Sequence, residues 1–183
     1  MFKIYTKKGD SGLSFLPKMN KKVSKSNLIF EVLGTFDELE VCLGFLHSAR
    51  LGDIRKVAVE IQNDLLSLGT ILSAGGKISE EKIEFWENRV KELEEIVDYF
   101  EEKNDPLETF ILPGGCRESG FLHLGRVTCR KLERITVAYL KGEKDKMFII
   151  KYLNRLSDLL FVMARYSNKK LGFKDIIWKN KES

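Results

Sequence analysis

The segment 147–170 is apolar around almost its whole circumference when it is written as an α-helix, and this constrains the fold more than any other feature of the chain. The large apolar side chains in it are Phe148, Tyr152, Leu153, Leu156, Leu159, Leu160, Phe161, Val162 and Met163. A helix that is hydrophobic on nearly all sides must be surrounded by other elements. The pattern therefore predicts a central, largely buried helix.

Four further segments have helical periodicity and can surround it. They run from about 27 to 50, from 53 to about 72, from 79 to about 100 and from about 119 to 141. Asp53 and Ser79 are expected to cap the second and third of them, and the charged faces of the third predict that it lies on the outside. The three prolines (Pro17, Pro106 and Pro113) fall outside all periodic segments. Short connections between long helices favour an antiparallel bundle.

The predicted fold is therefore all-α, an antiparallel five-helix bundle of ferritin-like type. The chain of 183 residues fits one domain, 1–183, with a large core. Residues 1–25 form a polar N-terminal arm in which Gly9, Gly12 and Pro17 lie among lysines and serines, as in an ordered or semi-ordered loop. Residues 26–172 form the bundle, and 173–183 a C-terminal tail.

Composition excludes several classes of protein. A hydrophobic content of 43% with 32% charged residues is typical of a globular chain, and the net charge of +4 permits an anionic small ligand without favouring nucleic acid. Cys42, Cys116 and Cys129 are odd in number and lack metal-type spacing, so they indicate reduced thiols. With no signal peptide and no membrane-spanning apolar run, we expect a cytoplasmic protein that does not enter membranes.

Three arginines recur at helical spacing in the segment 119–141. Arg126, Arg130 and Arg134 stand at i, i+4 and i+8, where like charges repel by about 0.2–0.5 kcal/mol per exposed pair, and Glu133 offsets only part of this. Lysine is the usual cation here (22 Lys, 9 Arg), yet six of the nine arginines lie between 117 and 165. The cluster indicates either an anion site, with phosphate as the natural ligand, or a solvated helix face.

Polar residues also interrupt the apolar segment 147–170, namely Asn154, Arg155, Ser157 and Asp158. Each such group left unpaired in a core costs about 1–3 kcal/mol. They indicate either a buried network that fixes helix register or the wall of a site in a cleft or at a subunit boundary.

The connection Thr109–Gly115 places bulky side chains before a Pro-Gly-Gly sequence that cannot continue a helix. It either covers the end of the core or positions Phe110 over a flat hydrophobic ligand.

Several familiar motifs are excluded by context. The segment 9–12 (GDSG) has no protease-like chain before it, and the segment 7–14 lacks the spacing of a Walker loop. Neither His47 nor His123 belongs to a Glu-x-x-His pair, so a di-iron site has no support.

Five segments together resemble the PduO-type ATP:cob(I)alamin adenosyltransferases. They are 5–12 (YTKKGDSG), 34–39 (GTFDEL), 110–115 (FILPGG), 126–134 (RVTCRKLER) and 154–158 (NRLSD), in the order in which that family carries them. The resemblance covers nearly the whole chain. It implies a five-helix bundle that assembles as a homotrimer, with active sites between subunits.

The resemblance also implies roles for individual residues. ATP would be bound by Thr6, Lys7, Lys8, Gly9, Ser14, Phe15, Lys25, Arg130, Lys131, Glu133, Arg134 and Asn154. The corrinoid would be bound by Phe110 and Phe161, and Arg126 would pair with Asp37 across the subunit interface, these two forming the catalytic set with Arg130. No residue is assigned to a metal. Ser11, Ser14 and Lys131 depart from the family's usual Lys, Thr and Arg, which bears on ATP affinity.

The implied reaction transfers the 5′-deoxyadenosyl group of ATP to the Co(I) of cob(I)alamin or a related corrinoid, with Mg²⁺ assisting and triphosphate leaving. The metal is the nucleophile, so no activated Ser, Cys or His is required. The expected partners are a reductase and an adenosylcobalamin-dependent client enzyme. Two alternatives are a non-catalytic bundle that senses ATP or carries adenosylcobalamin, and a purely structural helical oligomer.

Overall fold

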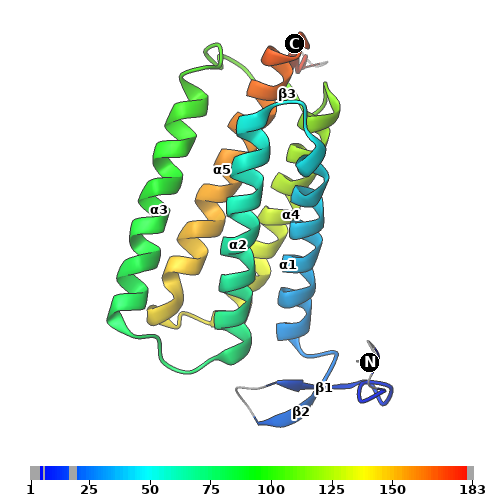
Figure 1. Cartoon of the computed structure of the whole chain (residues 1–183), viewed down its shortest axis with the longest axis vertical. Helices are drawn as coiled ribbons and strands as arrows, with labels where there is room; N and C mark the ends of the chain where they lie inside the picture. Colours follow the sequence, from blue (N-terminus) through cyan, green and yellow to red (C-terminus); the bar gives the residue numbers. More distant parts are fainter. Residues whose placement is uncertain (1–4, 6, 17–19, 181–183) are drawn as a thin grey trace.

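A computed structural model describes residues 5, 7–16 and 20–180, and Figure 1 shows an antiparallel helical bundle with a small hairpin beyond one end. The helices are α1 (Leu28–Gly44), α2 (Gly52–Ala74), α3 (Glu80–Glu101), α4 (Arg117–Leu140) and α5 (Met147–Lys170), with 3₁₀ turns η2 (Phe45–Ser48) and η3 (Lys144–Lys146). Successive helices alternate in direction (Figure 1). The predicted five-helix bundle is confirmed.

Helix α5 lies at the centre, as its sequence predicts, and has the predicted bounds. It packs between α4 and α3, while α1 packs on α4 and α2. Its buried side chains include Tyr152, Leu153, Leu156, Leu159 and Leu160, which are inaccessible to solvent. Helix α3 packs mainly on α5 and keeps its charged faces in solvent, so the predicted outer position is also confirmed.

The helix ends follow their capping groups, and three differ from the sequence prediction. Helix α1 ends at Gly44, not near Arg50, and the chain continues as the 3₁₀ turn η2. Ser79 caps α3 as expected, its side chain accepting the Lys82 N–H at 3.4 Å. Asp53 does not cap α2; it lies in the first turn, where its carboxylate accepts the Tyr166 hydroxyl at 2.6 Å. Helix α4 begins two residues earlier than expected, because the Cys116 side chain accepts the Ser119 N–H at 3.4 Å.

A polar cluster fixes the register of α2, α3 and α5. One Asp64 oxygen accepts both the Tyr152 hydroxyl and the Arg89 Nε–H, each at 2.7 Å. Tyr152 is fully buried, and removing one partner of such a cluster would leave the others unpaired at a cost of about 1–3 kcal/mol each.

Two small antiparallel sheets accompany the helices and were not predicted. In the arm, β1 (Leu13–Leu16) pairs with β2 (Lys21–Ser24), so the expected loop is a hairpin. At the opposite end of the bundle, β3 (Ile111–Leu112) pairs with β4 (Ile176–Ile177) of the tail. The second sheet ties the connection between α3 and α4 to the chain that follows α5.

Gly115 holds the start of α4 against α5, and we expect Gly115→Ala to lower the free energy of unfolding by at least about 2 kcal/mol. Its φ of +114° is a left-handed conformation, and a Cβ there would lie 2.1 Å from Asn168 Oδ1. Asn168 cannot retreat easily, because Oδ1 accepts the Cys116 N–H and Nδ2 donates to the Gly114 carbonyl, each at 2.9 Å.

Denaturant unfolding monitored by circular dichroism measures this effect. Gly120→Ala is the matched control, because Gly120 is helical and a Cβ there meets open space, so this variant should be at least as stable as the original protein. Equal stability of the two variants would contradict the proposed constraint at Gly115.

Candidate functional site

Arginines of α4 meet an aromatic ring of α5 in a cleft of about 350 Å³, here called the α4–α5 cleft. Its lining residues are Val97, Glu101, Arg126, Arg130, Ser157, Asp158, Phe161 and Val162. Because residues four apart share one face of a helix, Arg126 and Arg130 point the same way. The cleft therefore contains two of the three residues predicted as the catalytic set, Arg126 and Arg130, together with Phe161 of the predicted corrinoid set.

Arg126 brings an unpaired, buried hydrogen-bond donor to this cleft. Its Nε is buried and has no hydrogen-bond partner, and its guanidinium lies 6.0 Å from the centre of the Phe161 ring. Burial, and secondarily the charge of Arg130, lower the pKa of Arg126. All three observations mean that a negative charge brought into the cleft would be stabilised.

His123 lies beside the same ring and adds a second unpaired atom. Its imidazole is 6.1 Å from the Phe161 ring, and its buried Nδ1 has no partner. Burial, with the neighbouring Arg126, lowers the pKa of His123 to about 4, so the side chain is neutral near pH 7. His123 carries no sequence signal of a site residue, because it belongs to no Glu-x-x-His pair or other motif.

Asp37 does not meet Arg126 within one chain. It is exposed on α1, and Arg126 has no ion-pair partner among residues 5, 7–16 and 20–180. Within the chain the charge of Asp37 acts on Glu40: burial raises the pKa of Glu40, and the negative charge of Asp37 raises it further. The expected pairing across a subunit interface stays a prediction.

The remaining cations of α4 divide between two faces. Lys131 turns toward α1, where its ammonium lies 3.3 Å from Glu38 and 3.5 Å from Glu31. Arg134 donates to the Arg130 carbonyl at 3.0 Å and is exposed. Arg130 and Lys131 are adjacent in sequence, yet Arg130 lines the α4–α5 cleft and Lys131 points away from it.

The predicted ATP residues Glu133 and Asn154 meet each other in a different hollow. Asn154 Nδ2 donates to Glu133 Oε1 at 3.1 Å, at the rim of a cavity of about 460 Å³ between α3, α4 and α5. Arg155 lies there too, paired with Glu94 at 3.0 Å and with Asp158 at 3.2 Å. Asn154, Arg155 and Asp158 therefore lie at surface clefts of the single chain and not in a buried network. Ser157 is buried and donates to the Asn154 carbonyl at 2.9 Å.

The arm gathers most of its predicted ATP residues in one hollow of about 840 Å³, here called the arm hollow. Those that line it are Lys8, Gly9, Ser14, Phe15 and Lys25. A Cβ at Gly9 would lie 3.1 Å from Lys25 Nζ, so glycine lets this ammonium approach the backbone. Lys7 adopts a left-handed turn with φ +58°, and Thr6 lies outside the described residues. Figure 1 shows this hairpin beyond the end of its own bundle.

Phe110 lies at the other end of the bundle, immediately before β3, with 79% of its surface exposed. Its ring packs edge-on against Trp178, with 6.3 Å between ring centres. Phe110 does not line the α4–α5 cleft that contains Phe161, so one chain does not unite the two predicted corrinoid residues.

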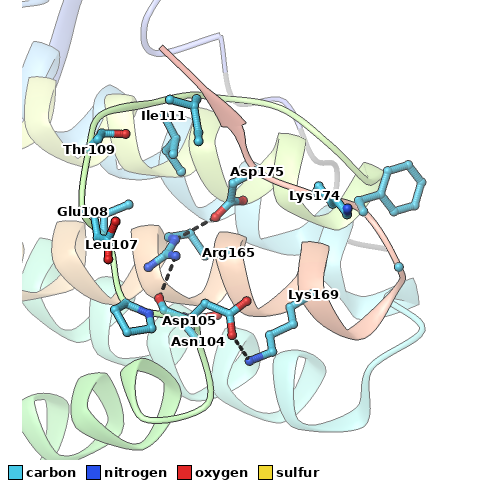
Figure 2. Close-up of a pocket in the computed structure, with 14 residues that line it drawn as sticks. Asn104, Asp105, Leu107, Glu108, Thr109, Ile111, Arg165, Lys169, Lys174 and Asp175 are labelled. Atoms are coloured by element: carbon cyan, nitrogen blue, oxygen red, sulfur yellow. Dashed lines mark hydrogen bonds and ion pairs between the residues drawn. The ribbon is translucent and has the colours of Figure 1, made fainter. Parts of the chain in front are cut away.

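Beneath this sheet lies a cleft of about 510 Å³, the tail cleft, between the α3–β3 connection and the tail (Figure 2). Arg165 donates to Asp175 at 2.8 Å and to the Asp105 carbonyl at 2.9 Å, and Lys169 pairs with Asp105 at 2.8 Å. These cations are already neutralised, so they anchor the tail. No motif predicted this cleft.

Over residues 5, 7–16 and 20–180 no group of three or more His, Cys, Asp or Glu side chains is arranged to hold a metal ion. Within the same ranges, none of the helices combines the length and apolarity needed to cross a bilayer.

The structure thus defines a five-helix bundle in which two arginines of α4 and an aromatic ring of α5 line one surface cleft. Residues 4–167 match the model of the cobalamin adenosyltransferase family, and the chain belongs to this family.

Similar proteins occur in several organisms. The corrinoid adenosyltransferase MMAB of Bos taurus is 34% identical over 187 residues, covering 98% of this chain and 77% of its own. The corrinoid adenosyltransferase of Bacillus subtilis is 33% identical over 184 residues, covering 95% and 91%. A PduO-type ATP:corrinoid adenosyltransferase from Lactobacillus reuteri, a phenylalanine-to-alanine variant complexed with cobalamin and ATP, superposes with a TM-score of 0.85 at 29% identity, over 97% of this chain and 100% of its own.

Proposed function

We propose that this protein transfers the 5′-deoxyadenosyl group of ATP to the Co(I) of a reduced corrinoid, giving adenosylcobalamin and inorganic triphosphate. The observation that carries the proposal is the pair of unsatisfied groups beside Phe161, Arg126 Nε and His123 Nδ1, next to the exposed Arg130. Membership of the cobalamin adenosyltransferase family, and solved relatives complexed with cobalamin and ATP, support it.

The electron pair that forms the carbon–cobalt bond comes from Co(I), which becomes Co(III). The bond from the ribose 5′ carbon to its oxygen breaks, and triphosphate leaves with that electron pair. No side chain has to act as nucleophile or general base. The residues of the protein hold the 5′ carbon in line and stabilise the charge of the leaving triphosphate, a task that suits Arg126, Arg130 and the arm lysines.

A homotrimer would complete the site. Asp37 and Val41 lie one turn apart on α1, and Phe45 follows at the start of η2; the two apolar side chains are exposed at 60% and 46%. Leu124 and Val127 of α4 are exposed at 49% and 48%. Apolar side chains this exposed favour burial against another copy. Such packing would bring Asp37 to a neighbour's Arg126, and the arm hollow to a neighbour's α4.

The remaining assignments follow the family. Phe110 and Phe161 would face the corrinoid. The residues of the arm hollow would bind the phosphates of ATP, and these phosphates would bring Mg²⁺ with them. We expect the reaction to take place in the cytoplasm, with a reductase supplying the electron and an adenosylcobalamin-dependent enzyme receiving the product.

One assay separates an enzyme from a sensor or carrier. The protein is incubated anaerobically with ATP, Mg²⁺ and chemically reduced cobalamin, and the visible spectrum is followed, with light scattering to measure the assembly. We expect adenosylcobalamin to form with multiple turnovers, from a particle of three chains. ATP binding without a carbon–cobalt product would reject the enzyme and leave the carrier.

A further inference from the structure

The tail strand carries an aromatic residue directly opposite Phe110. The register of the second sheet pairs Ile111 with Ile177, so the next pair outward is Phe110 with Trp178. The Trp178 N–H donates to the Phe110 carbonyl at 2.8 Å, which extends the ladder by one bond. Their rings meet edge-on, at 81° and 6.3 Å between centres. Cross-strand aromatic pairs in this geometry attract each other.

The sheet has two different faces because successive side chains of a strand alternate. Thr109, Ile111 and Ile177 line the tail cleft, and Figure 2 shows Thr109 and Ile111 on the segment that crosses above Arg165. Phe110 and Trp178 therefore belong to the opposite face. That face is open, with Phe110 79% and Trp178 47% exposed.

The position of Trp178 is fixed by contacts three residues earlier. Asp175 accepts from Arg165 at 2.8 Å and from Asn168 Nδ2 at 3.2 Å. The Arg165 side chain is only 10% exposed, so this ion pair is shielded from solvent. Asn168 also accepts the Cys116 N–H, so the tail is tied to the start of α4. The tail strand thus has one register relative to β3.

We propose that Trp178 is a positioning residue that holds the Phe110 ring in the orientation in which it meets the corrinoid. The inference rests on the proposed function. Phe110 lies on a connection that leads into Pro113-Gly114-Gly115 and has little other side-chain contact, so its rotamer is set mainly by the residue opposite. A ring held in one rotamer meets a flat ligand without losing conformational freedom on binding.

The test uses the full chain with Trp178→Ala, Trp178→Phe, Phe110→Ala and the double variant. Phe85→Ala is the control, because Phe85 is an exposed aromatic (61%) with an edge-on ring contact to Trp86, on α3. Three readouts are taken for each variant: ATP affinity, turnover from cob(II)alamin and from pre-reduced cob(I)alamin, and the visible and electron paramagnetic resonance spectra of cob(II)alamin bound with ATP.

We expect Trp178→Ala to slow turnover from cob(II)alamin by about two- to tenfold, the range of one aromatic pair. A smaller fraction of the bound cob(II)alamin should lack its lower axial ligand than in the original protein. Turnover from cob(I)alamin and ATP affinity should stay within about twofold, since a general structural defect would lower all of them. Trp178→Phe should restore most of the loss, and the double variant should be no slower than Phe110→Ala, because the two residues act as a unit.

A Trp178→Ala protein with original spectra and rates would overturn the inference, as would equal losses from both corrinoid forms or no recovery with phenylalanine. These outcomes leave the proposed function standing, since the original protein still turns over. An original protein that forms no carbon–cobalt bond would overturn both.

Discussion

Replacing Arg130 with alanine is expected to reduce turnover by about 10²-fold or more, the usual effect of deleting one preorganised donor at a developing charge. Arg130 is exposed at the α4–α5 cleft and has no carboxylate partner in the described part of the chain. The variant therefore loses a cation that is free to meet triphosphate, without breaking an internal ion pair. We also expect weaker ATP binding, measured by calorimetry.

Two further variants separate charge from geometry. Arg130→Lys keeps the positive charge but loses the planar fork that binds two phosphate oxygens at once, so it should lie between the original protein and alanine. Lys82→Ala removes an exposed cation from α3, away from the cleft, and should stay within about twofold of the original. Near-normal kinetics of Arg130→Ala would remove the arginine stripe from the mechanism.

Replacing Phe110 with alanine is expected to lower turnover from cob(II)alamin by about tenfold or more, a loss of about 1.4 kcal/mol in transition-state stabilisation. A bulky apolar ring at the lower face of cobalt would exclude water and the axial ligand, and loss of that ligand makes cob(II)alamin easier to reduce. Pre-reduced cob(I)alamin needs no such help, so its turnover should fall much less. Steady-state rates with each substrate, under strict anaerobiosis, measure the difference.

The stability of this variant should be almost unchanged, because Phe110 is mostly exposed in the single chain and its ring contacts mainly Trp178. Thermal unfolding of the variant and of the Phe85→Ala control checks this. Equal losses from the two corrinoid forms would assign Phe110 to general binding instead.

The sequence was most informative where a pattern extends over many residues. Helix α5 has the predicted bounds, Met147–Lys170. A helix with apolar side chains around almost its whole circumference can bury them only at the centre of the bundle. Likewise, Arg126 and Arg130 share the α4–α5 cleft because the helical repeat fixes their common face. Both results depend on periodicity alone.

Shorter elements could not be predicted in this way. Strands β3 and β4 have two residues each and lie on either side of two long helices, so neither carries an alternating pattern. The strands of the hairpin β1–β2 have only four residues each, Leu-Ser-Phe-Leu and Lys-Lys-Val-Ser, which is too short for a clear periodic pattern. Such strands depend on tertiary pairing more than on local preference.

The candidate site could be predicted only as far as one chain contains it. A residue next to Arg130 in a helix is rotated by about 100°, so Lys131 faces α1 while Arg130 faces the cleft. Asp37 on α1, the arm hollow beside β1 and β2, and Phe110 next to β3 lie at separate places on the single chain. The homotrimer that we propose would join them, and no periodicity in the sequence encodes how subunits are arranged.

The two tryptophans give the protein an internal optical probe. Trp86 is 2% exposed and packs within the core against Phe148 and Tyr152. Trp178, directly after β4, is about half exposed to solvent. Their fluorescence should therefore differ in colour, with the redder emission coming from the tail. A corrinoid that docks on this end of the bundle would quench the redder component first, so arrival of the ligand can be timed in a stopped-flow instrument without any label.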